Sequence, residues 1–134
     1  MAVSAIRKVG RYLRLLNKAF EFDEQKNIFR VKEKIDDKEI MIIISFSRNW
    51  VTISHYCGSI KDLPKEKQCE IYRKLLRLNN DYAEVSFSID EEGNIFSSEE
   101  ILVDALTLDV FMEEYNAIPI SAELFEKEIK PLME

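Results

Sequence analysis

Glycine is scarce in this sequence, with three residues in 134, at positions 10, 58 and 93. A phosphate-binding loop or a dinucleotide fingerprint needs several glycines at short fixed spacings, because their backbone must approach a phosphate closely. The three glycines lie far apart and cannot form either motif. Phosphate-loop and Rossmann-type functions are therefore excluded.

Histidine and cysteine are also rare, with one histidine, His55, and two cysteines, Cys57 and Cys69. One histidine leaves little for Ser-His or Cys-His catalysis, and the three side chains fall short of the four ligands of a structural zinc site. His55 and Cys57 have strand spacing and could form a thiolate pair, but we favour an ordinary strand histidine and two small buried cysteines. We expect no enzyme, no catalytic residue, no cofactor and no metal site.

Carboxylates are plentiful, in the clusters 90–92, 99–100 and 113–114. Paired acids can bind divalent cations or perform acid–base catalysis, so a hydrolase or metal enzyme is a third-ranked hypothesis. The turn 90–94 lacks the ligand spacing of a calcium loop. We interpret these acids as solvated turn and helix surfaces.

Long hydrophobic runs are absent, since the longest, Ile40 to Ser45, has the length of a strand. A membrane-spanning helix needs roughly 18 apolar residues, so we expect no membrane segment. The N-terminus shows no secretion signal, which favours a cytoplasmic protein without a disulfide framework. The hydrophobic content of 46% and the charged content of 33% suit a single domain over residues 1–134.

The net charge of −6 hides an uneven distribution. Residues 1–90 carry 17 basic and 13 acidic side chains, and residues 91–134 carry 2 and 12. Arg7, Arg11, Arg14 and Lys18 recur with helical period and form a basic stripe on the first predicted helix. The stripe either pairs with acids, of the C-terminal helix or of a protein partner, or binds nucleic acid. Nucleic acid is the less favoured partner, because no aromatic residue is interleaved with the stripe and the sequence pI is about 5.0.

Hydrophobic periodicity predicts the order helix, three strands, helix, two strands, helix. The predicted helices cover residues 3–20, 62–80 and 107 to the C-terminus, and the predicted strands cover 29–35, 40–46, 50–56, 82–90 and 95–103. Asp62 and Thr107 are the expected helix caps, and Asn79 and Asn80 are expected to end the second helix. Ile118-Pro119 should interrupt the last helix, which restarts at Ser121. The fold class is α+β, α-β-β-β-α-β-β-α, with an antiparallel sheet packed by helices.

Trp50 and Tyr56 occupy the less apolar face of the third predicted strand. They either pack in the core against a helix or form an exposed aromatic patch for a protein partner.

The segment Leu75-Leu76-Arg77-Leu78-Asn79-Asn80, followed by an alternating strand and the acidic turn 90–94, resembles the YbjN-like family. Ile101-Leu102-Val103-Asp104 and Lys130-Pro131-Leu132 add to this resemblance, whereas Pro119 departs from the family pattern. The family shares the Tir-chaperone-like fold of type III secretion chaperones.

The resemblance implies a non-enzymatic module that acts as a homodimer and binds another protein or peptide. Candidate binding residues are Arg7, Arg11, Arg14, Lys18, Trp50 and Tyr56. The alternative hypothesis is a nucleic-acid-binding regulator that uses the basic first helix.

Overall fold

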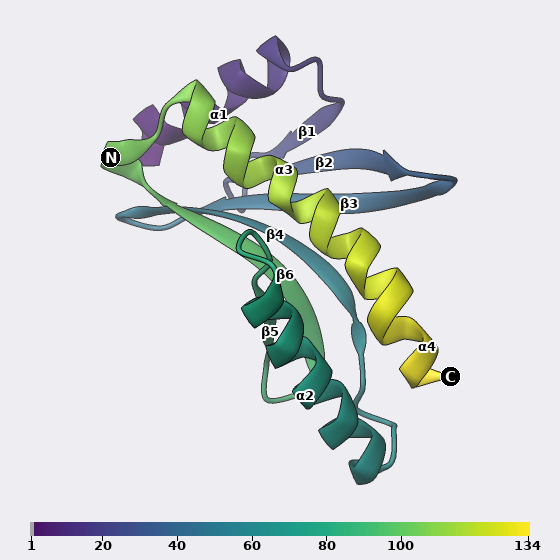
Figure 1. Cartoon of the computed structure of the whole chain (residues 1–134). Helices are drawn as coiled ribbons and strands as arrows, with labels where there is room; N and C mark the ends of the chain where they lie inside the picture. The colour runs from purple at the N-terminus through teal and green to yellow at the C-terminus, as the bar shows by residue number, and fades with distance from the viewer. Residues whose placement is uncertain (1) are drawn as a thin grey trace.

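Helices and antiparallel strands follow one another along the chain, of which the computed structural model describes residues 2–134. The elements are α1 (Ala2–Leu15), β1 (Phe20–Asp23), β2 (Ile28–Ile35), β3 (Lys38–Phe46), β4 (Trp50–Ser59), α2 (Lys65–Asp81), β5 (Phe87–Ile89), β6 (Asn94–Leu102), the 3-10 turn η1 (Val103–Ala105), α3 (Leu108–Leu124), the π-helical turn η2 (Phe125–Ile129) and α4 (Lys130–Met133). The strands form one antiparallel sheet in the order β1-β2-β3-β4-β6-β5 (Figure 1). The predicted α+β class with an antiparallel sheet is confirmed.

Strand β1 is missing from the predicted element order, which extends the first helix to Phe20. In the structure α1 ends at Leu15, and Asn17 adopts a φ of 57°. The amide of Lys18 donates to the carbonyl of Leu13 at 2.9 Å. A left-handed residue of this kind ends a helix, and asparagine tolerates the conformation better than most residues. Phe20 therefore begins a strand.

Helices α1 and α3 cover the centre of one face of the sheet, here called the core face. Alternate strand residues point to this face, and they are the apolar ones, so the strand period of two produces the layer. Each fully buried Val, Leu, Ile, Phe or Met side chain contributes about 1.5–3 kcal/mol to stability. The largest buried residues of this first cluster are Leu13, Phe29, Ile42, Ile44, Ile53, Ile101, Phe111, Tyr115 and Ile118.

A second hydrophobic cluster lies at the other end of the core face, where α2 packs against β5, β6 and η2. Helix α3 with its continuation runs the length of the molecule and belongs to both clusters (Figure 1). The buried residues of this cluster include Ile60, Ile71, Leu75, Leu78, Phe87, Ile95, Phe125 and Ile129.

The predicted interruption at Ile118-Pro119 is wrong, because α3 continues through Pro119 to Leu124. Proline lacks the amide hydrogen that would bond to the Tyr115 carbonyl, and its ring crowds that carbonyl. Ile118 and Ser121, on either side, are buried, so packing against the sheet holds the helix in place. The helix becomes irregular only at η2.

The predicted N-cap residue is correct for α3 and wrong for α2. The Thr107 hydroxyl accepts a hydrogen bond from the Val110 amide at 3.2 Å, as expected of an N-cap. Asp62 does not cap α2, since the helix begins at Lys65 and Pro64 occupies the cap position without a side-chain hydrogen bond. Proline fits there because its lost amide would have no helical partner.

Asn79 and Asn80 do not end α2, which continues to Asp81. The Asn79 amide group instead binds the backbone of Phe87 in β5. Asn79 Nδ2 donates to the Phe87 carbonyl at 3.0 Å, and the Phe87 amide donates to Asn79 Oδ1 at 2.8 Å. One side chain thus takes the place of a neighbouring strand at this edge of the sheet.

Strand β4 joins the two halves of the sheet. It pairs with β3 only through Val51–Ser54, whereas its pairing with β6 extends from Trp50 to Ser59. A register shift between Tyr56 and Gly58 marks a β-bulge. Beyond Ser54, strands β3 and β4 therefore separate.

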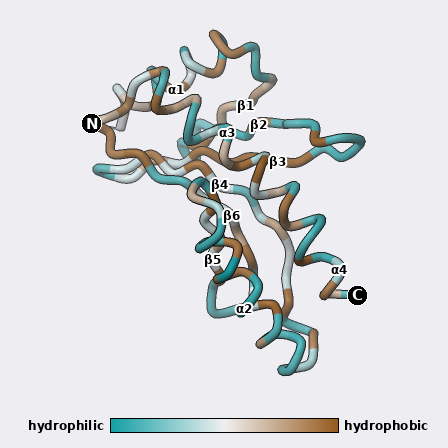
Figure 2. Tube along the Cα trace, in the orientation of Figure 1, coloured by the Kyte–Doolittle hydropathy of each residue, from teal (hydrophilic) through white to brown (hydrophobic). Residues whose placement is uncertain are grey.

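Polar residues mark the loops and the outer side of the helices. In Figure 2 the connection between β2 and β3 is hydrophilic, and hydrophobic and hydrophilic segments alternate along α3 and its continuation. No helix within residues 2–134 combines the length and the apolar character needed to cross a bilayer.

Candidate partner-binding surfaces

A groove of about 390 Å³ lies between α1 and β1, and is called the α1–β1 groove below. Helix α1 places every third or fourth side chain on this side. The groove thus combines arginines from the helix with phenylalanines from the strands. Its lining residues are Ile6, Arg7, Gly10, Arg11, Arg14, Phe20, Phe22 and Phe29.

Three phenylalanine rings contribute the apolar part of this groove. Phe29 lies 5.6 Å from Phe20 and 4.8 Å from Phe22 between ring centroids, in edge and tilted arrangements that aromatic pairs prefer. Gly10 faces them, since a Cβ atom at this position would lie 3.5 Å from Phe29 Cζ. The missing side chain at Gly10 therefore lets the helix backbone pack closely on Phe29, which is buried, while Phe20 and Phe22 stay partly exposed.

The basic stripe has three members in the structure, Arg7, Arg11 and Arg14, all exposed. Within residues 2–134 none of them forms an ion pair. The Arg14 guanidinium lies 6.0 Å from the centre of the Phe20 ring, in a cation–π contact. These positive charges are available to an acidic partner.

Lys18 does not belong to the stripe, because it follows the end of α1. Its ammonium group pairs with Glu33 of β2 at 2.8 Å and lies 5.3 Å from the centre of the Tyr115 ring. One alternative for the stripe was pairing with acids of the chain's own C-terminal helix. Lys18 contacts that helix only through its cation–π interaction with Tyr115, and its ion pair is with Glu33 of β2. Lys18 has a structural role in holding β2 and α3 together.

Strand β1 forms one edge of the sheet and borders the groove. The Lys32 amide donates to the Ala19 carbonyl at 3.3 Å, and hydrogen-bonded pairs alternate along antiparallel strands. The backbone groups of Phe20 and Phe22 therefore point away from β2, toward the open side. Such an edge can accept another extended strand.

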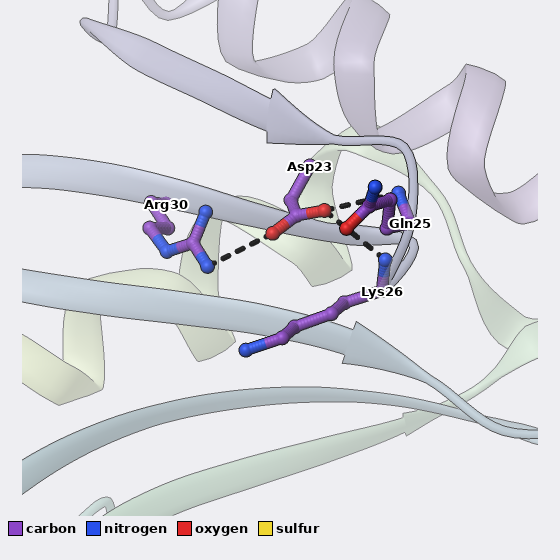
Figure 3. A network of polar contacts seen from close by, with 4 residues as sticks. All are labelled: Asp23, Gln25, Lys26 and Arg30. Carbon is purple, nitrogen blue, oxygen red and sulfur yellow. Dashed lines mark hydrogen bonds and ion pairs between the residues drawn. The ribbon is translucent and has the colours of Figure 1, made fainter.

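The turn after β1 is fixed by Asp23 (Figure 3). Asp23 Oδ1 accepts hydrogen bonds from the Gln25 and Lys26 amides at 3.0 and 3.1 Å, and Oδ2 pairs with Arg30 at 3.0 Å. These donors lower the pKa of Asp23, chiefly through the Lys26 amide and then the Arg30 guanidinium. The turn thus holds β1 in register with β2.

Trp50 and Tyr56 lie on the face of the sheet opposite the core face, here called the helix-free face. Their side chains are 41% and 52% exposed, so they are not core residues. Tyr56 packs edge-on against Phe96 of β6 with 5.7 Å between ring centroids. The two predicted residues share this face but stand at opposite ends of β4, and neither borders the α1–β1 groove.

Helix α2 carries an apolar stripe on its exposed side. Tyr72 and Leu76 are 38% and 69% exposed, and Cys69 precedes them on the same side of the helix. The expectation that Cys69 is buried is wrong. The sequence contains a signal for this exposed stripe. Ile71 and Leu75 already form the buried side of the helix, so the additional apolar residues beside them lie at the surface.

The remaining reactive groups are held by structural contacts. His55 Nδ1 lies 3.0 Å from the Met41 carbonyl, and burial raises the pKa of the half-buried Cys57 thiol to about 12, which disfavours a thiolate. Burial, with Glu114, Glu84 and Glu100 nearby, raises the pKa of Glu99 to about 7. No group of three or more His, Cys, Asp or Glu side chains in residues 2–134 is placed to hold a metal ion.

This fold has known relatives. The family model CesT_Tir_1 matches residues 2–131. The chain belongs to the CesT_Tir_1 family. The predicted similarity to the type III secretion chaperone fold is thereby confirmed.

Solved structures with this fold cover nearly the whole chain. A chain of the ExsC–ExsE complex superposes with a TM-score of 0.66 at 16% identity, over 96% of both chains. A chain of the ExoU–SpcU complex from the type III secretion system of Pseudomonas aeruginosa gives 0.62 at 12%, over 92% of this chain and 96% of that one. YbjN from E. coli gives 0.64 at 9%, over 92% of both. At these identities the likeness shows the fold alone.

No curated protein compared with the chain matches it significantly.

Proposed function

We propose that the chain is a non-enzymatic, chaperone-like module that acts as a homodimer and holds an extended, acidic segment of another protein in the α1–β1 groove. The observation that carries this proposal is the juxtaposition of Arg7, Arg11 and Arg14, without ion pairs in residues 2–134, with exposed parts of Phe20 and Phe22. Arginine beside aromatic rings is typical of protein interfaces.

The backbone groups at the β1 edge support an extended conformation for the bound segment. A strand added there would receive main-chain hydrogen bonds from Phe20 and Phe22, while its side chains meet the rings and the guanidinium groups. The ExsC–ExsE and ExoU–SpcU structures are protein complexes, which agrees with a protein as partner.

The α2 stripe supports the homodimer. Tyr72 and Leu76 expose apolar side chains on the surface of the helix, and burying them against a second copy of the chain is energetically favourable. In a two-fold interface the same stripe meets itself, which requires no second complementary surface. Cys69 lies on this stripe and provides a natural position for cross-linking.

The experiment combines light scattering with affinity capture of the full chain from its native host. The triple variant Arg7→Glu, Arg11→Glu, Arg14→Glu should bind the captured partner at least tenfold more weakly. A variant with the same charge change at Lys26, Lys32 and Lys34, all exposed outside the groove, is the matched control and should bind normally. A monomer that captures no partner would contradict the proposal.

Nucleic-acid binding is the second candidate function. The structure brings Phe20 and Phe22 beside the arginines, which supplies the aromatic rings that the helix sequence lacks. Binding of a fluorescent single-stranded oligonucleotide at low salt, where phosphate attraction is strongest, tests this function. No change in anisotropy under these conditions would eliminate it.

A further inference from the structure

A cavity of about 290 Å³ opens where β3 and β4 separate, and is called the β3–β4 cavity below. Residues 38–42 of β3 pair only with β2. Residues 55–59 of β4 pair only with β6, except Cys57 in the β-bulge, so the space between the strands is not closed by a β3–β4 ladder. The end of α3 and the start of η2 form the third wall. The lining residues are Ile35, Asp36, Asp37, Lys38, Ile40, His55, Cys57, Ala122, Glu123, Phe125, Glu126 and Lys127.

The wall of this cavity is apolar and contains one imidazole. Ile35, Ile40, Ala122 and Phe125 supply carbon atoms, and the Cys57 thiol stays protonated because burial raises its pKa to about 12. The volume is near the lower limit for ligand pockets, which measure roughly 300–1,000 Å³. The cavity therefore suits a small molecule with an apolar body.

The His55 ring presents a hydrogen-bond acceptor. A carbonyl oxygen can only accept, so the contact with Met41 at 3.0 Å requires that Nδ1 carries the hydrogen. In the neutral imidazole Nε2 is then an acceptor, and it has no hydrogen-bond partner within residues 2–134. A ligand bound beside it must therefore donate a hydrogen bond.

The rim of the cavity carries four carboxylates and two ammonium groups. Both lysines already have partners, since Lys38 pairs with Glu126 at 2.9 Å and Lys127 pairs with Glu123 at 2.8 Å. Asp36 and Asp37, in the β2–β3 turn, form no ion pair within residues 2–134. Lys130 also reaches Glu126, at 3.3 Å, so the unpaired carboxylates at the rim are those of Asp36 and Asp37, and their negative charge favours a cation.

We propose that the β3–β4 cavity binds a small arylalkylamine, with the ring against Ile40 and Phe125 and the ammonium group between His55 Nε2 and the rim carboxylates. The ammonium group supplies the donor that Nε2 needs and the positive charge that the rim favours. This site shares no lining residue with the α1–β1 groove.

The test is an NMR titration of the ¹⁵N-labelled full chain with 2-phenylethylamine at about pH 7.5, where an alkylamine carries its positive charge. The amide signals of Lys38, His55, Cys57 and Phe125 should shift together. Two probes with the same phenylethyl group but a different polar end separate the contribution of the charge from that of the apolar body. We expect 2-phenylethanol to bind at least about tenfold more weakly, and 3-phenylpropionate not to bind detectably.

Two variants test the location of the site. Ala122→Leu fills the cavity and should weaken amine binding at least about tenfold. Asp36→Asn with Asp37→Asn should lower the preference for amine over alcohol to less than about threefold, while asparagine tolerates the φ of 54° at position 36. The matched control, Glu91→Gln with Glu92→Gln in the exposed β5–β6 turn, should leave both affinities unchanged.

Equal affinity for amine, alcohol and carboxylate would overturn the proposal, as would shifts confined to residues outside the cavity. Should Ala122→Leu fail to fold, the aspartate variant decides the outcome on its own. Amine preference that persists in that variant also rejects the site.

Discussion

Tyr115 of α3 donates its hydroxyl hydrogen bond to Glu33 Oε2 of β2 at 2.6 Å. The same carboxylate oxygen pairs with Lys18, so one acid connects the end of α1, the sheet and the long helix. Burial and the neighbouring carboxylate raise the pKa of Tyr115, which therefore remains a donor at every ordinary pH.

The first prediction concerns this connection. Tyr115→Phe should lower the free energy of unfolding by about 1–2 kcal/mol, because the mostly shielded carboxylate loses a hydrogen bond from a buried ring. Urea denaturation measures the change. Tyr82→Phe, at an exposed ring, is the control and should change stability by less than about 0.5 kcal/mol. Equal values for both variants would show that the Tyr115 bond adds nothing.

Asn79→Asp should destabilise the chain by about 2–3 kcal/mol. The carboxylate cannot donate to the Phe87 carbonyl, and it places a negative oxygen beside that acceptor. Asn80→Asp makes the same change one residue further along the helix, at an exposed position, and should have little effect. Guanidinium denaturation of the two variants gives the comparison, and a small loss in Asn79→Asp would contradict the strand-like role of this side chain.

Pro119→Ala should raise the free energy of unfolding by roughly 1–3 kcal/mol. Alanine restores the amide that can bond to the Tyr115 carbonyl and removes the ring that crowds it, while an interior proline costs about 3 kcal/mol. Thermal unfolding followed by circular dichroism measures the gain. A loss of stability would mean that the chain requires the proline at this turn.

Glu99 should make stability depend on pH. Its pKa in the folded chain is about 7, against 4.5 for an ordinary glutamate, so between these values the folded state binds more protons than the unfolded state. The free energy of unfolding should therefore fall as the pH rises from about 4.5 to 7. Glu99→Gln should flatten this dependence and stabilise the chain at pH 8 by about 1 kcal/mol, a value reduced for solvent screening of the partly exposed group. Glu91→Gln, at an exposed turn position that is not among the charges acting on Glu99, should leave the slope unchanged.

Leu76→Glu on the α2 stripe should turn the proposed dimer into a monomer without unfolding it, because the side chain is 69% exposed. Light scattering measures the mass, and circular dichroism checks the fold. Leu75→Glu is not a suitable control, since Leu75 is buried. Arg77→Glu, beside it on the exposed surface, is suitable and should remain a dimer if the stripe is the interface.

Periodic apolar residues predicted most elements, because the strands β2 to β6 and the three long helices each keep one face buried. The wrong secondary-structure predictions concern residues at which a tertiary contact outweighs the local conformational preference. Pro119 stays helical because its neighbours are packed on the sheet, and Asn79 binds β5 rather than ending α2. Strand β1 was missed because Phe20 also fits the helical period of α1, and a single asparagine at φ 57° decides between the two.

The candidate site was predicted in part. Arg7, Arg11 and Arg14 were predicted to share one side of the first helix because their spacing along the sequence follows the helical period. The phenylalanines beside them come from β1 and β2, and their position depends on the sheet pairing that no short window of sequence contains. The same holds for the helix-free face, since only the packing of all helices on one side leaves Trp50 and Tyr56 exposed. The cytoplasmic location and the single-domain assignment stay predictions.

Strand β4 has a consequence for the order in which the chain folds. Its partner β3 is joined to it by a short turn and is available as soon as both have left the ribosome, whereas β6 follows only after α2 and β5 have been synthesised. Local pairs close faster than distant ones, so α1 with β1–β4 should collapse first and wait with one side of β4 unpaired. During synthesis the edge of β4 is therefore a point at which the growing chain is most exposed to wrong strand partners, until β6 arrives.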